Sequence, residues 1–347
     1  MMKKITMQTI ADILDVSRVT VWKVHNGYPG VSDTLRKKII EKSNELGYQK
    51  LHTDDINNNT ERVANLSNEK TTISVVVSRP ESSIFWMDII HNIAKTLSTY
   101  NINLMYTYIP AKVYENYKLP EILYDGTVQG VIVLNIYDYK VMSLINSLSI
   151  PKVFLDMVPA ITSLSLTGDL VLLEGYHAIY NITENIIKKG RKKIGFIGDI
   201  NYALTNYTRY EGFTAAINNN NLDINEDYCL IDSIGIYTYA EEINEFLSHL
   251  DELPEAFVCA SDFIANFVLD YLKKNNYSVP DDIAISGYDD SREYTHLSGD
   301  LTTVQVRNDA LGERLVRQLL YRMEHHDYPI ETISIQSKIL FKKSTDF

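Results

Sequence analysis

The most distinctive surface chemistry in the first fifty residues is predicted on one short helix. Val21 and Val24 form the apolar side of this helix. Arg18, Val19, Trp22 and Lys23 must therefore point away from the core. An outward arginine can donate two hydrogen bonds to a guanine edge, and an outward valine can pack on a thymine methyl group. Such a face is unusual for a purely structural helix and suits contact with double-stranded DNA.

A second set of candidate residues follows the predicted strands of the remaining chain. In open α/β sheets, ligands bind beyond the carboxyl ends of the strands, so the residues that directly follow each strand are candidates for a site. They are residues 78–86, Asp156, residues 198–209, Ser261 with Asp262, and residues 288–290.

Three short helices are expected to position the exposed face. Ser17 is the predicted N-cap of the second helix, with Val16 and Val21 as a hydrophobic staple. Asp15 occupies the preceding turn, where Asp tolerates left-handed geometry better than most residues. The first helix is expected to begin after Thr6, and the third to run from Ser32 to Gly47.

From residue 71 onward, short β-rich runs alternate with amphipathic helices. Strands separated by helices imply parallel sheets with crossover helices, and the number of units suggests two sheets. The runs that we interpret as strands are residues 73–77, 103–108, 130–134, 152–155, 193–198, 256–260 and 283–287. We therefore expect an α/β body of two Rossmann-like subdomains.

The distribution of charge also separates the first fifty residues from the rest of the chain. The 347 residues carry a net charge of −12, but residues 1–50 hold nine Lys or Arg against five Asp or Glu, a net charge of +4. Phosphate binding needs positive charge, so the basic head is where DNA could bind.

Composition excludes several other classes of function. The two cysteines, Cys229 and Cys259, are too few for a disulfide framework and are interpreted as packing residues. No apolar run of about 18 residues and no signal peptide is found, so we expect a cytoplasmic protein. The spacing of a dinucleotide-binding or phosphate-binding loop and the common hydrolase motifs are also absent. We therefore expect no enzyme activity, no metal and no cofactor.

The run from Val16 to Gly27 resembles the V-S-x-x-T-V-x-x-V-x-N-G signature of the LacI/GalR repressor family at each defined position. The resemblance implies a helix-turn-helix head in which Arg18 and Val19 read base edges. It implies that Ser17, Thr20 and Asn26 hold phosphates. Lys23 would either read a base edge or hold a phosphate. Trp22 packs on another helix or contacts the DNA, and Thr6 completes the expected DNA-binding set.

The segment after Tyr48 departs from the family pattern. The family usually continues with a hinge helix whose leucine wedges into the minor groove of the bound operator. Here residues 49–60 are polar and rich in asparagine, which reads as a flexible linker. Val63–Leu66 is a candidate remnant of the hinge, with Leu66 as the candidate wedge.

The resemblance continues through the body, in motifs at residues 209–213, 260–262, 287–290 and 301–304. It implies a periplasmic-binding-protein-like body in which Arg209 and Asp289 hydrogen-bond an effector that Phe85 and Trp86 cover. Such groups suit the hydroxyls and the apolar face of a sugar. The alternatives are a surface ion pair for Arg209 and a core position for the aromatic pair. Ser261 and Asp262 join the candidates, with helix capping as the alternative for Asp262.

These inferences predict a head over residues 1–50, a linker or atypical hinge over 51–70 and an effector-binding body over 71–347. We assign residues 71–165 with 302–328 to the first subdomain, and 166–301 with 329–347 to the second. The expected function is a homodimeric repressor of a pseudo-palindromic operator, controlled by a small polar effector. A sugar is the preferred effector, and a nucleoside or a phosphorylated sugar is the alternative. A solute-binding protein and an enzyme are the rival classes.

Overall fold

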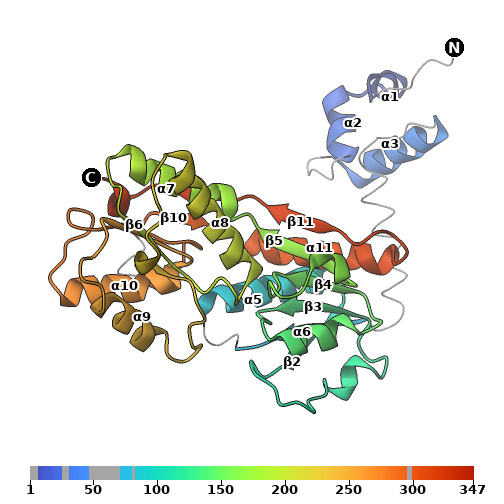
Figure 1. Cartoon of the computed structure of the whole chain (residues 1–347). Helices are drawn as coiled ribbons and strands as arrows, with labels where there is room; N and C mark the ends of the chain where they lie inside the picture. Colours follow the sequence, from blue (N-terminus) through green and yellow to red (C-terminus); the bar gives the residue numbers. More distant parts are fainter. Residues whose placement is uncertain (1–6, 26–30, 47–70, 80–82, 295–298) are drawn as a thin grey trace. The chain divides into compact units, whose positions relative to one another are not determined.

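The computed structural model describes residues 7–25, 31–46, 71–79, 83–294 and 299–347, without the side chains of Gln8, Trp22, Asp33 and Asn44. The chain divides into two compact units, Met1–Lys70 and Thr71–Phe347. The first unit holds the predicted helical head and the second the predicted α/β body (Figure 1). The expected linker over residues 51–70 lies outside the described residues.

The head consists of three helices around a small apolar core. They are α1 (Met7–Leu14), α2 (Arg18–His25) and α3 (Asp33–Glu45). Val16 packs against the same core, which supports the predicted staple. The backbone of Asp15 is left-handed, with φ of 52°, as the sequence predicted for the turn between α1 and α2. The buried core residues are Ile10, Ala11, Val21, Val24 and Ile39.

The body begins with a six-stranded parallel sheet, in the order β11-β5-β4-β3-β1-β2. Its buried β-branched runs leave both faces apolar, as a parallel sheet covered on both sides requires. Helices α5 (Ile84–Thr99) and α11 (Asn308–Glu324) cover one face, and α6 (Tyr139–Asn146) covers the other. The strands are β1 (Thr72–Val77), β2 (Asn103–Tyr108), β3 (Gly130–Leu134), β4 (Lys152–Leu155), β5 (Asp169–Leu173) and β11 (Thr332–Ile335).

A second parallel sheet has the order β7-β6-β8-β9. Helices α7 (Tyr176–Lys188) and α8 (Leu204–Asn219) lie on one side of it, and α9 (Tyr239–Ser248) and α10 (Asp262–Lys274) on the other (Figure 1). An antiparallel pair of β10 (Thr303–Gln305) and β12 (Lys338–Leu340) adjoins β9 through the bridge Ser286–Thr302 and the segment after β9 through the bridge Asp289–Gln305. The strands are β6 (Ile194–Ile197), β7 (Cys229–Leu230), β8 (Ala256–Cys259) and β9 (Ala284–Ser286).

The subdomain boundary differs from the one that we expected. We placed residues 166–301 and 329–347 in the second subdomain, but β5 and β11 both belong to the first sheet. The run Leu170–Leu173 is almost fully buried, and β5 pairs with β4 on one side and with β11 on the other. We therefore define the first lobe as residues 71–173 with α11 and β11, and the second lobe as residues 176–305 with 338–347.

The chain passes between the lobes three times. The crossovers follow β5, β10 and β11, near residues 174–175, 306–307 and 336–337. At the first crossover, the Glu174 amide donates to the Ile335 carbonyl at 2.9 Å, and the Glu174 carbonyl accepts from the Tyr288 hydroxyl at 2.7 Å. Three parallel connections can bend together, so they form the hinge between the two lobes.

Candidate functional site

The N-terminus of α2 has the geometry that the head motif predicts. The Ser17 hydroxyl accepts a hydrogen bond from the Thr20 amide at 2.9 Å, which confirms the predicted N-cap. It also lies 2.8 Å from the Thr20 hydroxyl. Arg18 is exposed, and Val19 is 60% exposed although it is apolar. The two residues that the sequence selected for base contacts therefore reach solvent.

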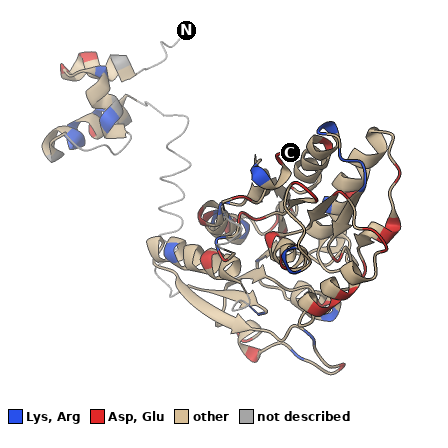
Figure 2. Ribbon diagram, turned by 90° about the vertical axis from the view of Figure 1, so that its left-hand side faces the viewer, with Lys and Arg blue, Asp and Glu red and all other residues tan. Residues whose placement is uncertain are grey.

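The cationic side chains of α2 are not used within the head. Among the described residues, the side chains of Arg18 and Lys23 take part in no hydrogen bond or ion pair. Figure 2 shows Lys and Arg on the helices of the head. Thr6, Asn26 and Leu66, like the side chain of Trp22, lie outside the described residues. Arg18, Val19 and Lys23 are thus the described part of a basic surface able to contact DNA.

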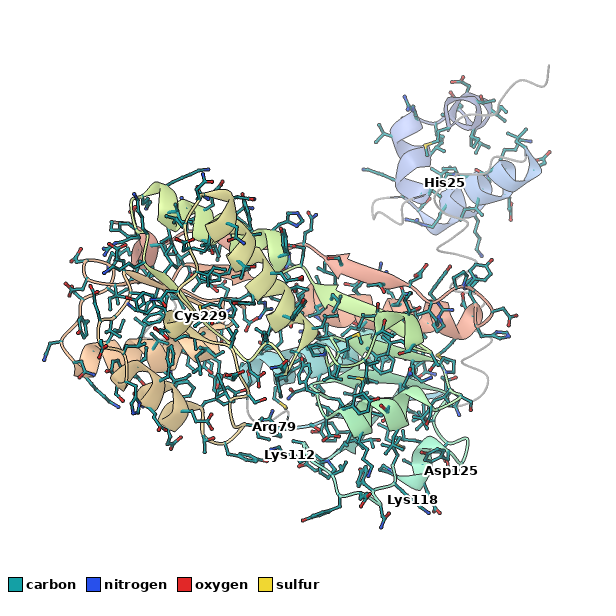
Figure 3. All side chains as sticks on the ribbon, in the orientation of Figure 1. His25, Arg79, Lys112, Lys118, Asp125 and Cys229 are labelled. Carbon is teal, nitrogen blue, oxygen red and sulfur yellow. The ribbon has the colours of Figure 1, made fainter. Side chains whose placement is uncertain are left out.

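One contact of α2 was not predicted from the sequence. His25, labelled in Figure 3, places Nε2 2.9 Å from the hydroxyl of Ser43 on α3. The Ser43 hydroxyl in turn donates to the Ile39 carbonyl at 2.7 Å. This partly buried polar link fixes the C-terminal end of α2 against α3, and so helps to orient the exposed face.

The body contains a cavity of about 220 Å³ between its two lobes. The first lobe contributes residues at the ends of β1, β3 and β4, and the second contributes α8, α9 and the segments after β8 and β9. Six aromatic side chains line it: Phe85, Trp86, Tyr137, Tyr202, Tyr239 and Phe263. The polar lining includes Arg79, Asn135, Asp156, Asn206, Arg209, Ser261 and Asp289.

Arg209 on α8 is the buried cation of this cavity, with 4% of its surface exposed. Its Nη1 donates to the Ala260 carbonyl at 2.6 Å, and its guanidinium lies 3.6 Å from the centre of the Tyr288 ring. Its Nε has no hydrogen-bond partner among the described residues. A Cβ on Gly175 would lie 2.6 Å from the Arg209 Cγ, so this glycine leaves room for the arginine. A buried donor without a partner is suited to bind a ligand acceptor.

Asp289 supplies the opposite charge. Its Oδ1 lies 4.0 Å from the Arg209 Nη2, too far for a direct hydrogen bond. Burial raises the pKa of Asp289 to about 6, although the Arg209 charge acts in the opposite direction. Its φ of 112° is rare for any residue except glycine, and strained backbone of this kind is typical of functional sites.

The two aromatic residues on the first lobe belong to the first turn of α5. Ser83 caps this helix, and its hydroxyl accepts from the Phe85 amide at 3.1 Å. The rings of Phe85 and Trp86 pack edge to face at 5.2 Å. Both are half-buried, pack against the core of the first lobe and line the cavity. The core and cavity interpretations therefore both apply.

Ser261 and Asp262 have different positions. Ser261 lines the cavity and caps α10, because its hydroxyl accepts from the Ile264 amide at 3.3 Å. Asp262 does not line the cavity, and we correct our expectation for it. Its carboxylate accepts from the Thr303 hydroxyl at 2.7 Å and from the Ser291 amide at 2.8 Å. It therefore holds the segment after β9 in place.

Direct contacts join the lobes around the cavity. The Thr205 hydroxyl donates to Asp156 at 2.5 Å, and Arg79 donates to the Tyr202 hydroxyl at 2.6 Å. The Tyr137 and Tyr202 ring centres are 4.4 Å apart. The sequence selected the ranges that hold Arg79, Asp156 and Tyr202, but it missed Tyr137. That residue follows β3, which was predicted as a strand, so the same strand-end rule could have found it.

The described residues give little support to a reactive thiol, a metal site or a membrane-spanning helix. Burial raises the pKa of Cys229 to about 11 and raises that of Cys259 as well, so both thiols stay protonated at neutral pH. No group of three or more potential metal ligands occurs in the described ranges. Nor does any described helix have the length and apolar character to cross a membrane.

Known proteins resemble the chain in sequence over its length. A family model described as a periplasmic binding protein-like domain matches residues 183–345. The HTH-type transcriptional repressor PurR of Mannheimia succiniciproducens is 27% identical over 345 residues, which cover 98% of each chain. Catabolite control protein A of Priestia megaterium is 25% identical over 347 residues, with 98% and 99% coverage.

Solved structures share the fold. The transcriptional regulator CelR in complex with cellobiose aligns with a TM-score of 0.70 at 20% identity, covering 98% of this chain and 99% of that one. The lac repressor dimer bound to operator and the anti-inducer ONPF aligns with a TM-score of 0.67 at 18% identity, covering 99% of each chain. The motif of α2 and the sequence similarity to repressors over 98% of the chain identify it as a member of the LacI/GalR family of transcription regulators, and the shared fold agrees with this.

Proposed function

We propose that this regulator binds a small polar effector, a sugar or sugar derivative, in the cavity between its lobes. The observation that carries the proposal is the pairing of Arg209 and Asp289 opposite Phe85 and Trp86. The unpartnered Nε of Arg209 can donate to a hydroxyl, and the Asp289 carboxylate can accept from one. The aromatic pair offers apolar surface for the face of a pyranose ring. The cellobiose ligand of CelR is consistent with this class.

The proposal extends to the head, where the cap at Ser17 and the exposure of Arg18 and Val19 support the following roles. Arg18 and Val19 read base edges, and Lys23 binds a phosphate or a base edge. Ser17 and Thr20 hold phosphates at the N-terminus of α2, where helix amides favour anions. Thr6, Trp22, Asn26 and the hinge candidate Leu66 complete the set as predictions from the sequence.

The operator is expected to be a pseudo-palindrome read by a homodimer, because a two-fold dimer presents two heads to successive half-sites. The operator complex of the lac repressor dimer is consistent with this arrangement. Exposed apolar side chains on β2 and α5 offer a surface for such a dimer: Tyr106 and Tyr108 are 48% and 52% exposed, and Met87 is 49% exposed. As a regulator of operators, the protein would work in the cytoplasm.

Control of DNA binding would pass through the hinge. An effector that contacts both lobes stabilises one relative orientation of the lobes, and this changes the spacing of the heads in the dimer. Linkage makes the coupling reciprocal, so a bound operator alters the affinity for the effector by the same factor. An inducer and a corepressor differ only in which orientation they favour.

The test is a thermal-shift screen of the full chain against monosaccharides, disaccharides, phosphorylated sugars and nucleosides. A ligand that binds only the folded state raises the apparent melting temperature. We expect a sugar to give a concentration-dependent rise that Asp289→Asn abolishes. Asp251→Asn, at an exposed position outside the cavity, should leave it intact. A rise with nucleosides alone, or one that Asp289→Asn leaves unchanged, would refute the assignment.

A further inference from the structure

A second cavity, of about 320 Å³, lies at the hinge. Its lining comes from the C-terminal ends of β5, β10 and β11 and from the beginnings of α11 and β12. The second and third crossovers therefore line the cavity, and Leu173, the last residue before the first crossover, borders it. It shares only Leu173 with the residues that line the effector cavity. The hinge cavity is therefore a separate space that borders the first one through a single side chain.

The inner wall of the hinge cavity is apolar. Leu173, Leu311 and Ile335 belong to or pack against the core of the first lobe. Val306 packs against the cores of both lobes, because it lies on the second crossover. An apolar molecule on this wall would remove hydrocarbon surface of the hinge from water.

The rim of the cavity is cationic. It carries Arg307, Arg314 and Lys338, and no Asp or Glu lines the cavity, although the chain as a whole has a net charge of −12. Arg307 is paired with Asp309 at 2.6 Å. Among the described residues, the side chains of Arg314 and Lys338 take part in no hydrogen bond or ion pair. Two cations at one apolar opening, both without a counter-charge, match an anion.

The two unpaired cations come from different lobes. Arg314 lies on α11, which packs on the first sheet, and Lys338 lies on β12, which pairs with β10 in the second lobe. An anionic group bound by both side chains would link the lobes at the hinge. A ligand with an apolar part would in addition fill the wall formed by Leu173, Val306, Leu311 and Ile335.

We propose that the hinge cavity binds a small amphipathic anion, with an apolar body and one carboxylate or phosphate group, held between Arg314 and Lys338. This site is independent of the effector cavity and of its ligand. Because the three crossovers move when the lobes rotate, the anion binds one orientation of the lobes better than the others. It is therefore a second input to the same hinge, coupled reciprocally to the effector.

The experiment is calorimetric titration of the full chain with phenyl phosphate at low ionic strength, where charge attraction is least screened. Inorganic phosphate tests the charge alone, and benzyl alcohol tests the apolar part alone. We expect saturable binding of phenyl phosphate at one site per chain and much weaker binding of the other two probes. Equal affinity for inorganic phosphate would overturn the amphipathic assignment, and no binding of phenyl phosphate would overturn the site.

Variants locate the site. Arg314→Gln with Lys338→Gln should weaken phenyl phosphate binding by about tenfold or more. The matched control, Lys118→Gln with Lys274→Gln, also removes one positive charge from each lobe, but at exposed positions outside the cavity; Lys118 is labelled in Figure 3. The control should retain wild-type affinity, and so should Asp289→Asn. An equal loss in the control would reveal bulk charge attraction, and loss in Asp289→Asn alone would place the probe in the effector cavity; either result overturns the proposal.

Discussion

Replacing Asp289 by Asn should stabilise the folded body at neutral pH, although we place Asp289 in the effector site. Asn is nearly isosteric and tolerates a positive φ about as well as Asp, so the strained backbone is unchanged. What the substitution removes is a buried negative charge whose pKa is raised from 3.8 to about 6. The variant therefore tests how much that charge costs.

The magnitude follows from the shift in pKa. Each tenfold change in the ionisation constant is worth about 1.4 kcal/mol, so ionised Asp289 disfavours the folded state by about 3 kcal/mol. Since 20% of the side chain is exposed, we reduce the expected gain for Asp289→Asn to about 2 kcal/mol. The Asp289 charge also raises the pKa of Asp262, which burial and its neighbours bring to about 7, so removing it eases the ionisation of Asp262 too.

The sign of the pH dependence is fixed by the direction of the shift. A raised carboxyl pKa means that between about pH 4 and 6 the folded state binds more protons than the unfolded state, so stability falls as pH rises. The cost is fully present above about pH 6 and disappears below the unfolded pKa of 3.8. The advantage of Asp289→Asn over the wild type should therefore be largest at pH 7.5 and fall to about a third of that at pH 4.5.

The assay is urea unfolding of the wild type, Asp289→Asn and the exposed control Asp251→Asn at both pH values, followed by circular dichroism. The control should match the wild type at both. Destabilisation by Asp289→Asn at pH 7.5 would show that Arg209 stabilises the Asp289 carboxylate more than burial penalises it. A gain that does not change with pH would show that the charge of Asp289 is not its source. Either result would refute the reasoning.

Three further predictions concern other parts of the chain. Arg18→Ala should cost about 1–3 kcal/mol on the preferred operator and relax one base position; fluorescence anisotropy checks this, and an equal loss on every sequence would make Arg18 a phosphate contact. Arg322→Met should destabilise the first lobe by about 3–5 kcal/mol. Asp169 is 0% exposed and lies 2.6 Å from Arg322, so the substitution leaves it as a buried unpaired charge. A melting temperature equal to that of the wild type would contradict this. Burial lowers the pKa of Lys152 to about 8. The wild type should therefore gain stability relative to Lys152→Met as pH rises from about 8 to 10.5. Urea unfolding of both proteins at both pH values measures this gain, and a difference that does not change with pH would count against it.

The head was predictable because its determinants are local. Ser17 caps the helix that it precedes, Asp15 adopts the left-handed turn that its side chain tolerates, and Val16 packs beside the α2 core residues. Each of these relations spans five residues or fewer, so spacing alone carries the information. The exposed position of Val19 follows from the same helical period.

In the body, sequence reasoning succeeded where a strand end or a family motif marked the residue. Arg209 and Asp289 were found in this way, and both line the effector cavity. The same rule selected Asp262, which also follows a strand but does not line the cavity. Whether a carboxylate faces the cavity depends on the hydrogen bonds that it accepts. Thr303 and Ser291, which hold it, are 41 and 29 residues away in the chain.

The lobe boundary and the hinge cavity depend on contacts of still longer range. Leu173 and Ile335 are adjacent only because β5 and β11 pair in parallel, a relation that no local pattern contains. Arg314 and Lys338 are each ordinary surface cations in the sequence, since Lys and Arg are common at exposed positions. Their significance arises when three crossovers bring them to one apolar opening without a counter-charge. If DNA binding is controlled by the orientation of the lobes, as we propose, a charge left unsatisfied at the hinge acts directly on that orientation, and this is why the hinge is where we expect a second input.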